Sequence, residues 1–464
     1  MSVRMPALAA LALCVLALAP VPAGAQAAAP PAESPPTVLH IPPAAARPAG
    51  SFDPEAATRA YLDTLSPEKR ARSDAYFEGG YWLQLWGLLY GIGVAWLLLG
   101  TRISARLRDL AEGISRLRPI QTALYGVGYI LLTTALTFPL TLYQDFFREH
   151  QYGLATQGFG GWMRDQGMGL VAGLILGTGL LVALYAVIRR APRTWWIWGS
   201  AVGLVFLVLV ALIAPVYLDP LFNTYKPLED ASVRDPILSM ARANGVPAEE
   251  VYEFDASRQS NRVSANVSGF AGTMRVRLND NLLNRCTLPE IKAVMGHELG
   301  HYVLHHVYEM LIEFGIVLVG ALAFLRWGFE RARRRWGERW GIRAIGDVAG
   351  LPLVVALVSV YFFVLTPVTN TIIRSNEQEA DIFGLNAARE PDGFAAVALK
   401  LADYRKLEPG RLEEWIFFDH PSGRARIEMA MRWKAEHLND PVIAAEDRAL
   451  AAPAPGGGSG QAGP

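Results

Sequence analysis

Six apolar runs, each long enough to cross a lipid bilayer, constrain the fold of this chain more than any other feature of its sequence. The runs cover residues 81–100, 122–143, 168–188, 195–216, about 308–324 and 348–366. Composition agrees, because hydrophobic residues make up 52% of the chain and charged residues only 19%. Main-chain polar groups in lipid need partners within their own segment, so we expect each run to be helical. The sequence predicts a polytopic, mainly α-helical membrane protein, with four spans in 81–216 and two in 308–366.

Arginine gathers in alternate connections between the predicted spans, and this pattern indicates the topology. Positively charged loops favour the cytoplasmic face, so the other polar segments are expected on the opposite, periplasmic side of a bacterial inner membrane. The whole chain carries 43 basic and 43 acidic residues, which gives no reason to expect a nucleic-acid partner. The connections after the first, third and fifth runs contain Arg102, Arg106, Arg108, Arg116 and Arg118; Arg189, Arg190 and Arg193; and Arg326, Arg331, Arg333, Arg334, Arg335, Arg339 and Arg343.

Both ends of the chain are expected to lie outside the folded part. Residues 1–25 combine Arg4, an apolar run through Leu18 and the small residues Ala23-Gly24-Ala25, which is typical of a signal peptide; an uncleaved anchor helix is the alternative. In both alternatives the segment after residue 25 is exported from the cytoplasm. Residues 26–50 are rich in Ala and Pro and predict a flexible linker that leads, within 26–80, into a charged N-terminal helix. Residues 441–464 predict a disordered tail.

Two polar segments, 217–307 and 367–440, have the patterns of one water-exposed domain interrupted by the last two spans and the arginine-rich loop between them. The first segment predicts a helix over 235–244, a strand over 251–254, and a hairpin formed by 264–270 and 274–278. Thr287, with Glu290 three residues later, predicts the capped start of another helix. The second segment predicts mostly helix.

That capped helix contains His297-Glu298-Leu299-Gly300-His301, the motif that points most directly to chemistry. Positions i and i+4 share one face of a helix, so both imidazoles can reach one cation. A catalytic Zn²⁺ ion takes three protein ligands and keeps one position open, and Glu298 lies within reach of a water there. The alternative is an amphipathic helix with two incidental histidines. The spacing favours a zinc peptidase centre, with one zinc ion per chain.

A third ligand is expected from the second polar segment. Glu377 and Asp381 lie four residues apart, so Glu377 could bind the metal while Asp381 accepts a hydrogen bond from a ligand histidine. Two spans separate His301 from Glu377, and an even number of crossings returns the chain to the same face of the membrane. Glu379 is turned away from the face that Glu377 and Asp381 share. A solvated acidic helix face is the alternative.

Hydrolysis of a peptide bond is the reaction that this ligand set predicts. Glu298 serves as general base toward the attacking water, and the developing oxyanion calls for a further donor. His420 and Arg426 are candidates for that donor, although a histidine before a turn-forming proline also suits an ordinary surface position. His305 and His306 also lie close to the motif. His305 continues the i+4 series and could be taken for a ligand, but we place it beyond the site, near the membrane interface.

A peptide or protein substrate could be held by main-chain pairing with an open strand edge. The strand over 274–278 is the candidate, which makes Met274, Arg275, Val276 and Arg277 the predicted substrate contacts. The alternative is an ordinary internal strand. The oligomeric state is left open by the sequence, and the lipid bilayer is the other expected partner.

These motifs together resemble the integral-membrane zinc peptidases related to CAAX prenyl proteases of type 1. The resemblance covers about residues 65–435 and rests on the motif at 297–301, on Glu377 with Asp381, and on His420-Pro421. Further matching segments are Pro139-Leu140 with Tyr143, Gly153-Leu154 with Gln157, Pro220-Leu221-Phe222-Asn223, and Pro227-Leu228.

The resemblance implies a helical membrane barrel joined to a gluzincin-like zinc peptidase domain that carries a small β-sheet. It implies zinc at His297, His301 and Glu377, Glu298 as the base, and His420 as a transition-state donor. Supporting positions would be Asp381, Arg374 and Arg426.

This chain departs from the family pattern at Ile373, where Ser is usual, and in the arginine pattern, which places the site outside the cytoplasm. We therefore expect exported or membrane-associated substrates. The alternatives are processing of prenylated C-termini on the cytosolic side and a non-catalytic scaffold or transporter.

Overall fold

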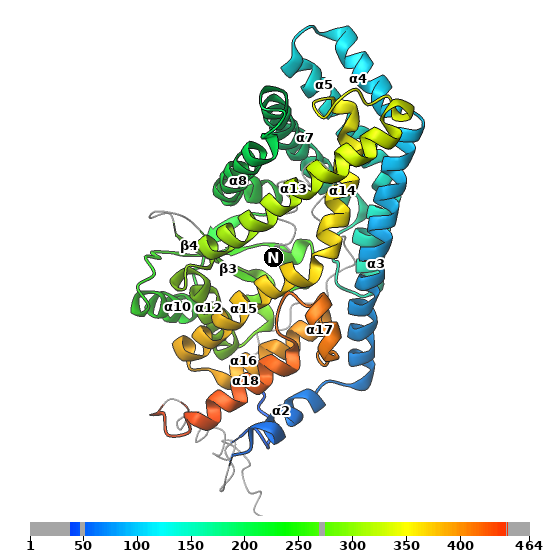
Figure 1. Ribbon diagram of the computed structural model, residues 1–464. Coiled ribbons are helices and arrows are strands. Elements are labelled where there is room, and N and C mark those ends of the chain that lie inside the picture. The colour runs from blue at the N-terminus through cyan, green and yellow to red at the C-terminus, as the bar shows by residue number, and fades with distance from the viewer. Residues whose placement is uncertain (1–37, 47–51, 269–273, 442, 444–464) are drawn as a thin grey trace, which may run out of the picture.

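The structure is a computed structural model that describes residues 38–46, 52–268, 274–441 and 443. The predicted signal peptide or anchor at 1–25 and nearly all of the predicted tail at 441–464 lie outside these residues. A long bundle of membrane helices stands beside a compact domain of shorter helices and one small sheet (Figure 1). The histidine motif at 297–301, the predicted metal site, lies in that domain, close to the ends of two bundle helices.

Among the described residues, five helices are long and apolar enough to cross a membrane. They confirm the first five predicted spans, and each extends beyond the apolar run that predicted it. Only 11–33% of their most apolar windows is buried within the protein, so lipid must cover the remaining apolar surface. The five are α3 (Pro67–Gly100), α5 (Arg118–Leu142) with a π-turn (Tyr143–Phe147) and α6 (Arg148–Gln151), α7 (Phe159–Arg190), α8 (Trp195–Ile213) with a π-turn (Ala214–Leu218) and α9 (Asp219–Phe222), and α13 (His306–Trp340).

The sixth predicted span is a broken one. Helix α14 (Leu351–Val364), preceded by a 3₁₀ turn (Val348–Gly350), has 14 residues and is about 21 Å long, which is less than the hydrocarbon core. It joins α15 (Thr366–Ala388) at Leu365 with a bend of 58°. Pro367 lies at the start of α15 and lacks the N–H that a continuous helix would need.

The predicted length of the arginine-rich loop between the last two spans is wrong, because most of that segment is helical. Helix α13 continues to Trp340, so the arginines from Arg326 to Arg339 lie on a helix and only Arg343 lies in the connection. The continuation is amphipathic: Phe329 and Ala332 are buried while Arg333 pairs with Glu330 one turn away.

The three arginine-bearing connections meet at one end of the bundle. The first contains helix α4 (Ile103–Ile114). Arg108 binds Asp347 at 2.6 Å, and Arg343 binds Glu112 at 2.7 Å. Arg189 donates to the carbonyl oxygen of Gly346 at 3.1 Å. This end lies opposite the domain that contains the histidine motif at 297–301 (Figure 1).

The sheet has four strands in the order β1-β2-β4-β3. Strands β3 and β4 form the predicted antiparallel hairpin, and β2 keeps its predicted bounds. The prediction that 274–278 forms an open edge is wrong, because β4 lies between β2 and β3 and Val276 and Leu278 are fully buried. The strands are β1 (Tyr225–Pro227), β2 (Val251–Phe254), β3 (Ala265–Ser268) and β4 (Arg275–Asn279); the helices around them are α10 (Ala231–Ala243), a 3₁₀ turn (Ala256–Arg258), α11 (Asp280–Arg285) and α12 (Leu288–Val303).

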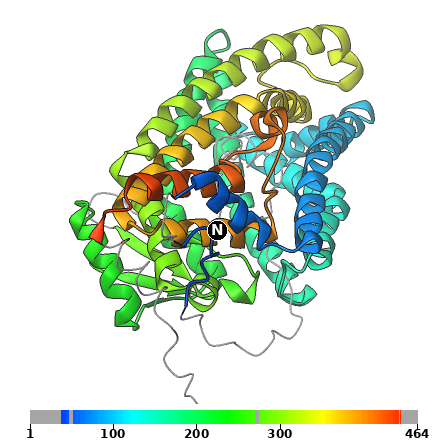
Figure 2. The same cartoon turned by 90° about the horizontal axis from the view of Figure 1, so that it is seen from below.

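The N-terminal and C-terminal parts of the described chain pack together. Figure 2 shows α2 (Pro54–Asp63) alongside α18 (Gly423–Glu436). Lys434 of α18 is fully buried, binds Asp392 at 2.6 Å, and donates to the carbonyl oxygen of Ala45 at 2.9 Å. The described part of the predicted flexible linker, residues 38–46, is therefore anchored to the domain. The remaining elements are α16 (Pro391–Lys400), a 3₁₀ turn (Leu401–Asp403) and α17 (Arg411–Phe417).

Candidate metal centre

Helix α12 begins where the sequence predicts. The main-chain N–H of Thr287 donates to Glu290 Oε2 at 2.6 Å, which is the reciprocal half of a capping box. Lys400 also binds this carboxylate, at 2.7 Å, and so ties the start of α12 to α16. The start of the helix that carries both histidines is thus fixed by buried polar contacts.

Glycine allows α12 and α15 to lie unusually close together. A Cβ atom added to Gly384 of α15 would lie 2.7 Å from the main-chain nitrogen of His297. A Cβ added to Gly296 would lie 2.8 Å from the carbonyl oxygen of Gly384. Backbone atoms cannot rotate out of the way, so larger residues would force the helices apart. This close approach brings Glu377 to the two histidines.

Three ligand atoms converge from these helices. The Nε2 atoms of His297 and His301 are 3.2 Å apart. Glu377 Oε2 lies 3.3 Å from His297 Nε2, and Glu377 Oε1 lies 3.6 Å from His301 Nε2. Two ligands of a tetrahedral zinc ion with bonds of 2.0–2.1 Å are about 3.3–3.5 Å apart. The structure therefore brings the three predicted ligands together at the spacing of one zinc site.

The chemistry of these groups also fits a cation. Glu377 Oε2 is buried and accepts no hydrogen bond of good geometry, although imidazole nitrogens lie 3.0–3.3 Å away, which leaves a charged oxygen incompletely satisfied. Burial lowers the pKa of His297, but the hydrogen bond to Asp381 and the Glu377 carboxylate outweigh it and raise the pKa to about 10. Burial and the charge of His297 lower the pKa of His301 to about 3, so its ring stays neutral. Carboxylates that attract a proton to His297 attract a metal ion as well.

Asp381 lies where the sequence predicts it, behind His297. His297 Nδ1 donates to Asp381 Oδ1 at 2.8 Å, which leaves Nε2 for the metal. The guanidinium of Arg426 binds the same oxygen, and Asp381 is fully buried. Arg426 is thus turned toward Asp381 and away from the role of oxyanion donor. Arg374 contacts none of the ligands: it donates to the carbonyl oxygens of Glu414 and Phe418 and holds the segment before His420.

Two titratable groups adjoin the ligand atoms. Burial raises the pKa of Glu298 to about 7, which suits a residue that must both take and release a proton near neutral pH. His420 Nε2 lies 3.0 Å from Glu377 Oε2, and its Nδ1 contacts Asp419 Oδ1 at 2.9 Å. Burial and Arg405 lower the pKa of His420, but Glu377 and Asp419 outweigh them and raise it.

His306 is a residue to which sequence reasoning assigned no role. Its Nδ1 lies 2.9 Å from His301 Nδ1, and its side chain is only 1% exposed. His306 therefore supports His301 as Asp381 supports His297. The contact depends on a left-handed turn at His305, with φ of 61°, which periodicity along one helix does not reveal. His305 itself contacts none of the ligands.

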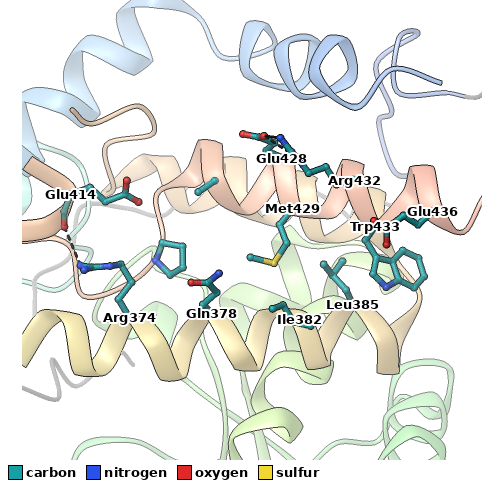
Figure 3. Close-up of a pocket in the computed structure, with 12 residues that line it drawn as sticks. Arg374, Gln378, Ile382, Leu385, Glu414, Glu428, Met429, Arg432, Trp433 and Glu436 are labelled. Carbon is teal, nitrogen blue, oxygen red and sulfur yellow. Dashed lines mark hydrogen bonds and ion pairs between the residues drawn. The ribbon is translucent and has the colours of Figure 1, made fainter. Parts of the chain in front are cut away.

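A groove of about 600 Å³ lies between α15 and α18 beside this centre (Figure 3). Ile382 and Leu385 of α15 face Met429 and Trp433 of α18, and charged side chains surround them. None of the three candidate ligands lines the groove. Arg374 lies at one end of the groove, where it donates to the carbonyl oxygen of Glu414 at 3.1 Å.

Comparison with known proteins identifies relatives across almost the whole described chain. Residues 227–434 match the model of peptidase family M48, and residues 54–224 match the model described as CAAX prenyl protease N-terminal, five membrane helices. A Bacillus subtilis protein named uncharacterized metalloprotease YhfN is 28% identical over 81% of this chain and 89% of its own length. CAAX prenyl protease 1 of Saccharomyces cerevisiae is 31% identical over 39% of this chain and 40% of its own. The crystal structure of S. mikatae Ste24p has the same fold, with a TM-score of 0.67 at 20% identity over 80% of this chain and 90% of that one.

Proposed function

The chain belongs to peptidase family M48, and we propose that it is a membrane-embedded zinc endopeptidase that cleaves exported or membrane-associated proteins. The observation that carries the proposal is the meeting of two imidazoles and one carboxylate from α12 and α15, all within 4.8 Å of one another. Glu298 comes directly after the first of these histidines, as in the arrangement that metalloproteases use. One zinc ion per chain, held by His297, His301 and Glu377, completes the centre.

Zinc in this position would polarise the carbonyl of the scissile bond and acidify the attacking water. Glu298 takes the proton from that water and then delivers it to the leaving amine. Its pKa of about 7 allows both transfers at neutral pH. His420 donates its Nε2 proton to the negative charge that develops on the carbonyl oxygen, since its Nδ1 is already held by Asp419. Asp381, clamped by Arg426, keeps the His297 ring oriented.

Strand β3 is the edge that an extended substrate would use. It occupies one end of the sheet and packs against α12, which carries the two histidines. An edge strand offers main-chain donors and acceptors to a peptide laid beside it. Main-chain pairing would therefore take place at β3, because β4 is an internal strand with no open edge.

We infer that the catalytic face is periplasmic in a bacterial inner membrane. The end of the bundle where Arg108, Arg189 and Arg343 gather lies opposite the metal centre, and such arginine-rich ends face the cytoplasm. Reporter fusions in the connection 341–347 and in the segment 228–249 test this orientation. A cytoplasmic signal from 228–249 would reverse it and would favour the processing of prenylated C-termini, the activity that the names of several relatives state.

The substitution Glu298→Gln tests the chemistry. The purified variant should keep its zinc and lose hydrolysis of denatured casein by about 10²–10⁴-fold, because only the proton acceptor is removed. Glu249→Gln, an exposed position in the same domain, is the matched control and should leave hydrolysis unchanged. Casein hydrolysis by zinc-loaded Glu298→Gln at the wild-type rate would exclude this mechanism.

A further inference from the structure

A second group of potential metal ligands lies directly behind the catalytic centre. His306 and Glu309 lie on the first turn of α13, and Glu379 lies on α15. One ligand atom from each lies within 4.8 Å of the others. We call these three residues the His306 cluster. His306 Nε2 and Glu379 Oε2 are 3.5 Å apart, which is long for a hydrogen bond but close to the spacing of two ligands on one zinc ion.

One imidazole nitrogen of the His306 cluster, His306 Nε2, has no hydrogen-bond partner within the described part of the chain. His306 is 1% exposed, and its Nε2 atom is buried without a hydrogen bond. Buried polar atoms nearly always have a partner, so this nitrogen requires an explanation. Acidic residues in a first turn also suit a helix N-terminus, which accounts for Glu309 but not for the orphaned nitrogen.

The charge around the cluster favours a cation as that partner. Glu313, one turn after Glu309, is close enough to be repelled by both Glu309 and Glu379, and its Oε2 atom is also buried without a hydrogen bond. Within the described residues, Glu309, Glu313 and Glu379 form no salt bridge with lysine or arginine. The salt bridge recorded for this group joins Glu379 to His306. Three carboxylates gathered beside one buried imidazole leave a local excess of negative charge.

We propose that the His306 cluster binds a second Zn²⁺ ion. One imidazole nitrogen with two carboxylate oxygens is a ligand set that suits zinc, and imidazole disfavours Mg²⁺ and Ca²⁺. Binding displaces the proton of His306 Nε2 to solvent. Glu309 and Glu379 are exposed, so the ion exchanges with solvent more readily than one held by the buried ligands of the catalytic centre.

The second ion is coupled to the first through one hydrogen bond, an effect that rests on the proposed function of the catalytic centre. His301, bound to metal through Nε2, carries its proton on Nδ1 and donates it to His306 Nδ1 at 2.9 Å. With an ion on His306 Nε2, the two rings hold only that one proton between them. The second ion therefore binds more weakly than the first. When both sites are filled, His301 shares its only proton with a metal-bound His306, which changes the charge that His301 donates to the first ion, so hydrolysis falls as the second ion binds.

Equilibrium dialysis of the full-length protein in detergent against rising free Zn²⁺ tests the second site. The wild type should bind two ions per chain, the second more weakly, and hydrolysis of casein should fall as the second ion binds. Glu309→Gln/Glu379→Gln should bind one ion tightly, keep basal hydrolysis, and need at least roughly tenfold more zinc for inhibition. Glu330→Gln, on the same helix and paired with Arg333, is the control and should behave as wild type.

The outcomes separate the two proposals. A wild type that hydrolyses casein with one bound ion and shows no inhibition at millimolar zinc would overturn the second site alone. Retention of the second ion by Glu309→Gln/Glu379→Gln would overturn it as well, because the ion would then lie elsewhere. A protein that binds no zinc and hydrolyses nothing would overturn the proposed function instead.

Discussion

Replacing Gly384 by alanine should disrupt the metal centre without changing any ligand side chain. The added Cβ would lie 2.7 Å from the main-chain nitrogen of His297 and 3.0 Å from its Cα, whereas ordinary contact begins at 3.4 Å. Since both neighbours are backbone atoms, α12 and α15 must separate by about 0.7 Å, which is the difference between 3.4 and 2.7 Å. Overpacking of this kind costs about 1–3 kcal/mol of folding free energy.

The same displacement acts on the ligand spacing. Carried to the ligands in full, a shift of about 0.7 Å would increase the distance between His297 Nε2 and Glu377 Oε2 from 3.3 Å to about 4.0 Å. Metal sites tolerate about ±0.2 Å in their bond lengths, so one of the ligands would no longer reach the ion at bonding distance. We expect zinc affinity to fall at least about 100-fold, or about 2.7 kcal/mol, at the upper end of the losses seen for supporting residues.

Competition with a chromogenic chelator measures this affinity in the detergent-solubilised protein, and thermal unfolding measures the stability. Gly315→Ala is the matched control, because a Cβ there meets nothing within 4 Å. Wild-type zinc affinity and hydrolysis in Gly384→Ala would show that the close helix contact does not set the ligand geometry.

Three further outcomes are expected from the same contacts. Asp381→Asn should weaken zinc binding by about 10–100-fold in the chelator assay, because the charged acceptor behind the ligand ring is removed; unchanged binding would contradict that role. His420→Gln should lower kcat by about 10²–10³-fold with full zinc content, while His437→Gln, far from the ligands, should not; equal rates in both would exclude the donor role. Burial raises the pKa of Cys286 to about 12 from 9.0. In a variant without Cys14, alkylation of Cys286 at pH 8 should therefore be about 1000-fold slower in the folded protein than after unfolding. The folded state should also lose stability as pH rises above 9, because the thiol then ionises in the unfolded chain first.

Features set by neighbouring residues were predictable from the sequence. Thr287 and Glu290 specify a helix start within three residues, and the strand over 251–254 has its predicted bounds. The ligands His297, His301 and Glu377 were inferred from helical spacing combined with an even number of membrane crossings. These inferences need no knowledge of which distant elements touch.

Features set by tertiary contacts were not predictable. The place of β4 inside the sheet depends on its parallel pairing with β2, which local alternation does not encode. The extension of α13 was missed because the apolar run ends near Phe324, whereas the helix continues with one buried stripe beneath its arginines. His306 reaches His301 only because the backbone at His305 is left-handed.

The short joints between the ligand helices and the membrane helices connect catalysis to the bilayer itself. Only Leu304 and His305 separate α12 from α13, and only Leu365 separates α14 from α15. His301 and Glu377 are therefore attached to two different membrane helices through joints of one or two residues. A thinner or thicker bilayer tilts such helices, and any relative tilt changes the distance between the two ligands. Lipid thickness and lateral pressure would thus change the spacing of the candidate ligands, an effect that a detergent micelle does not reproduce.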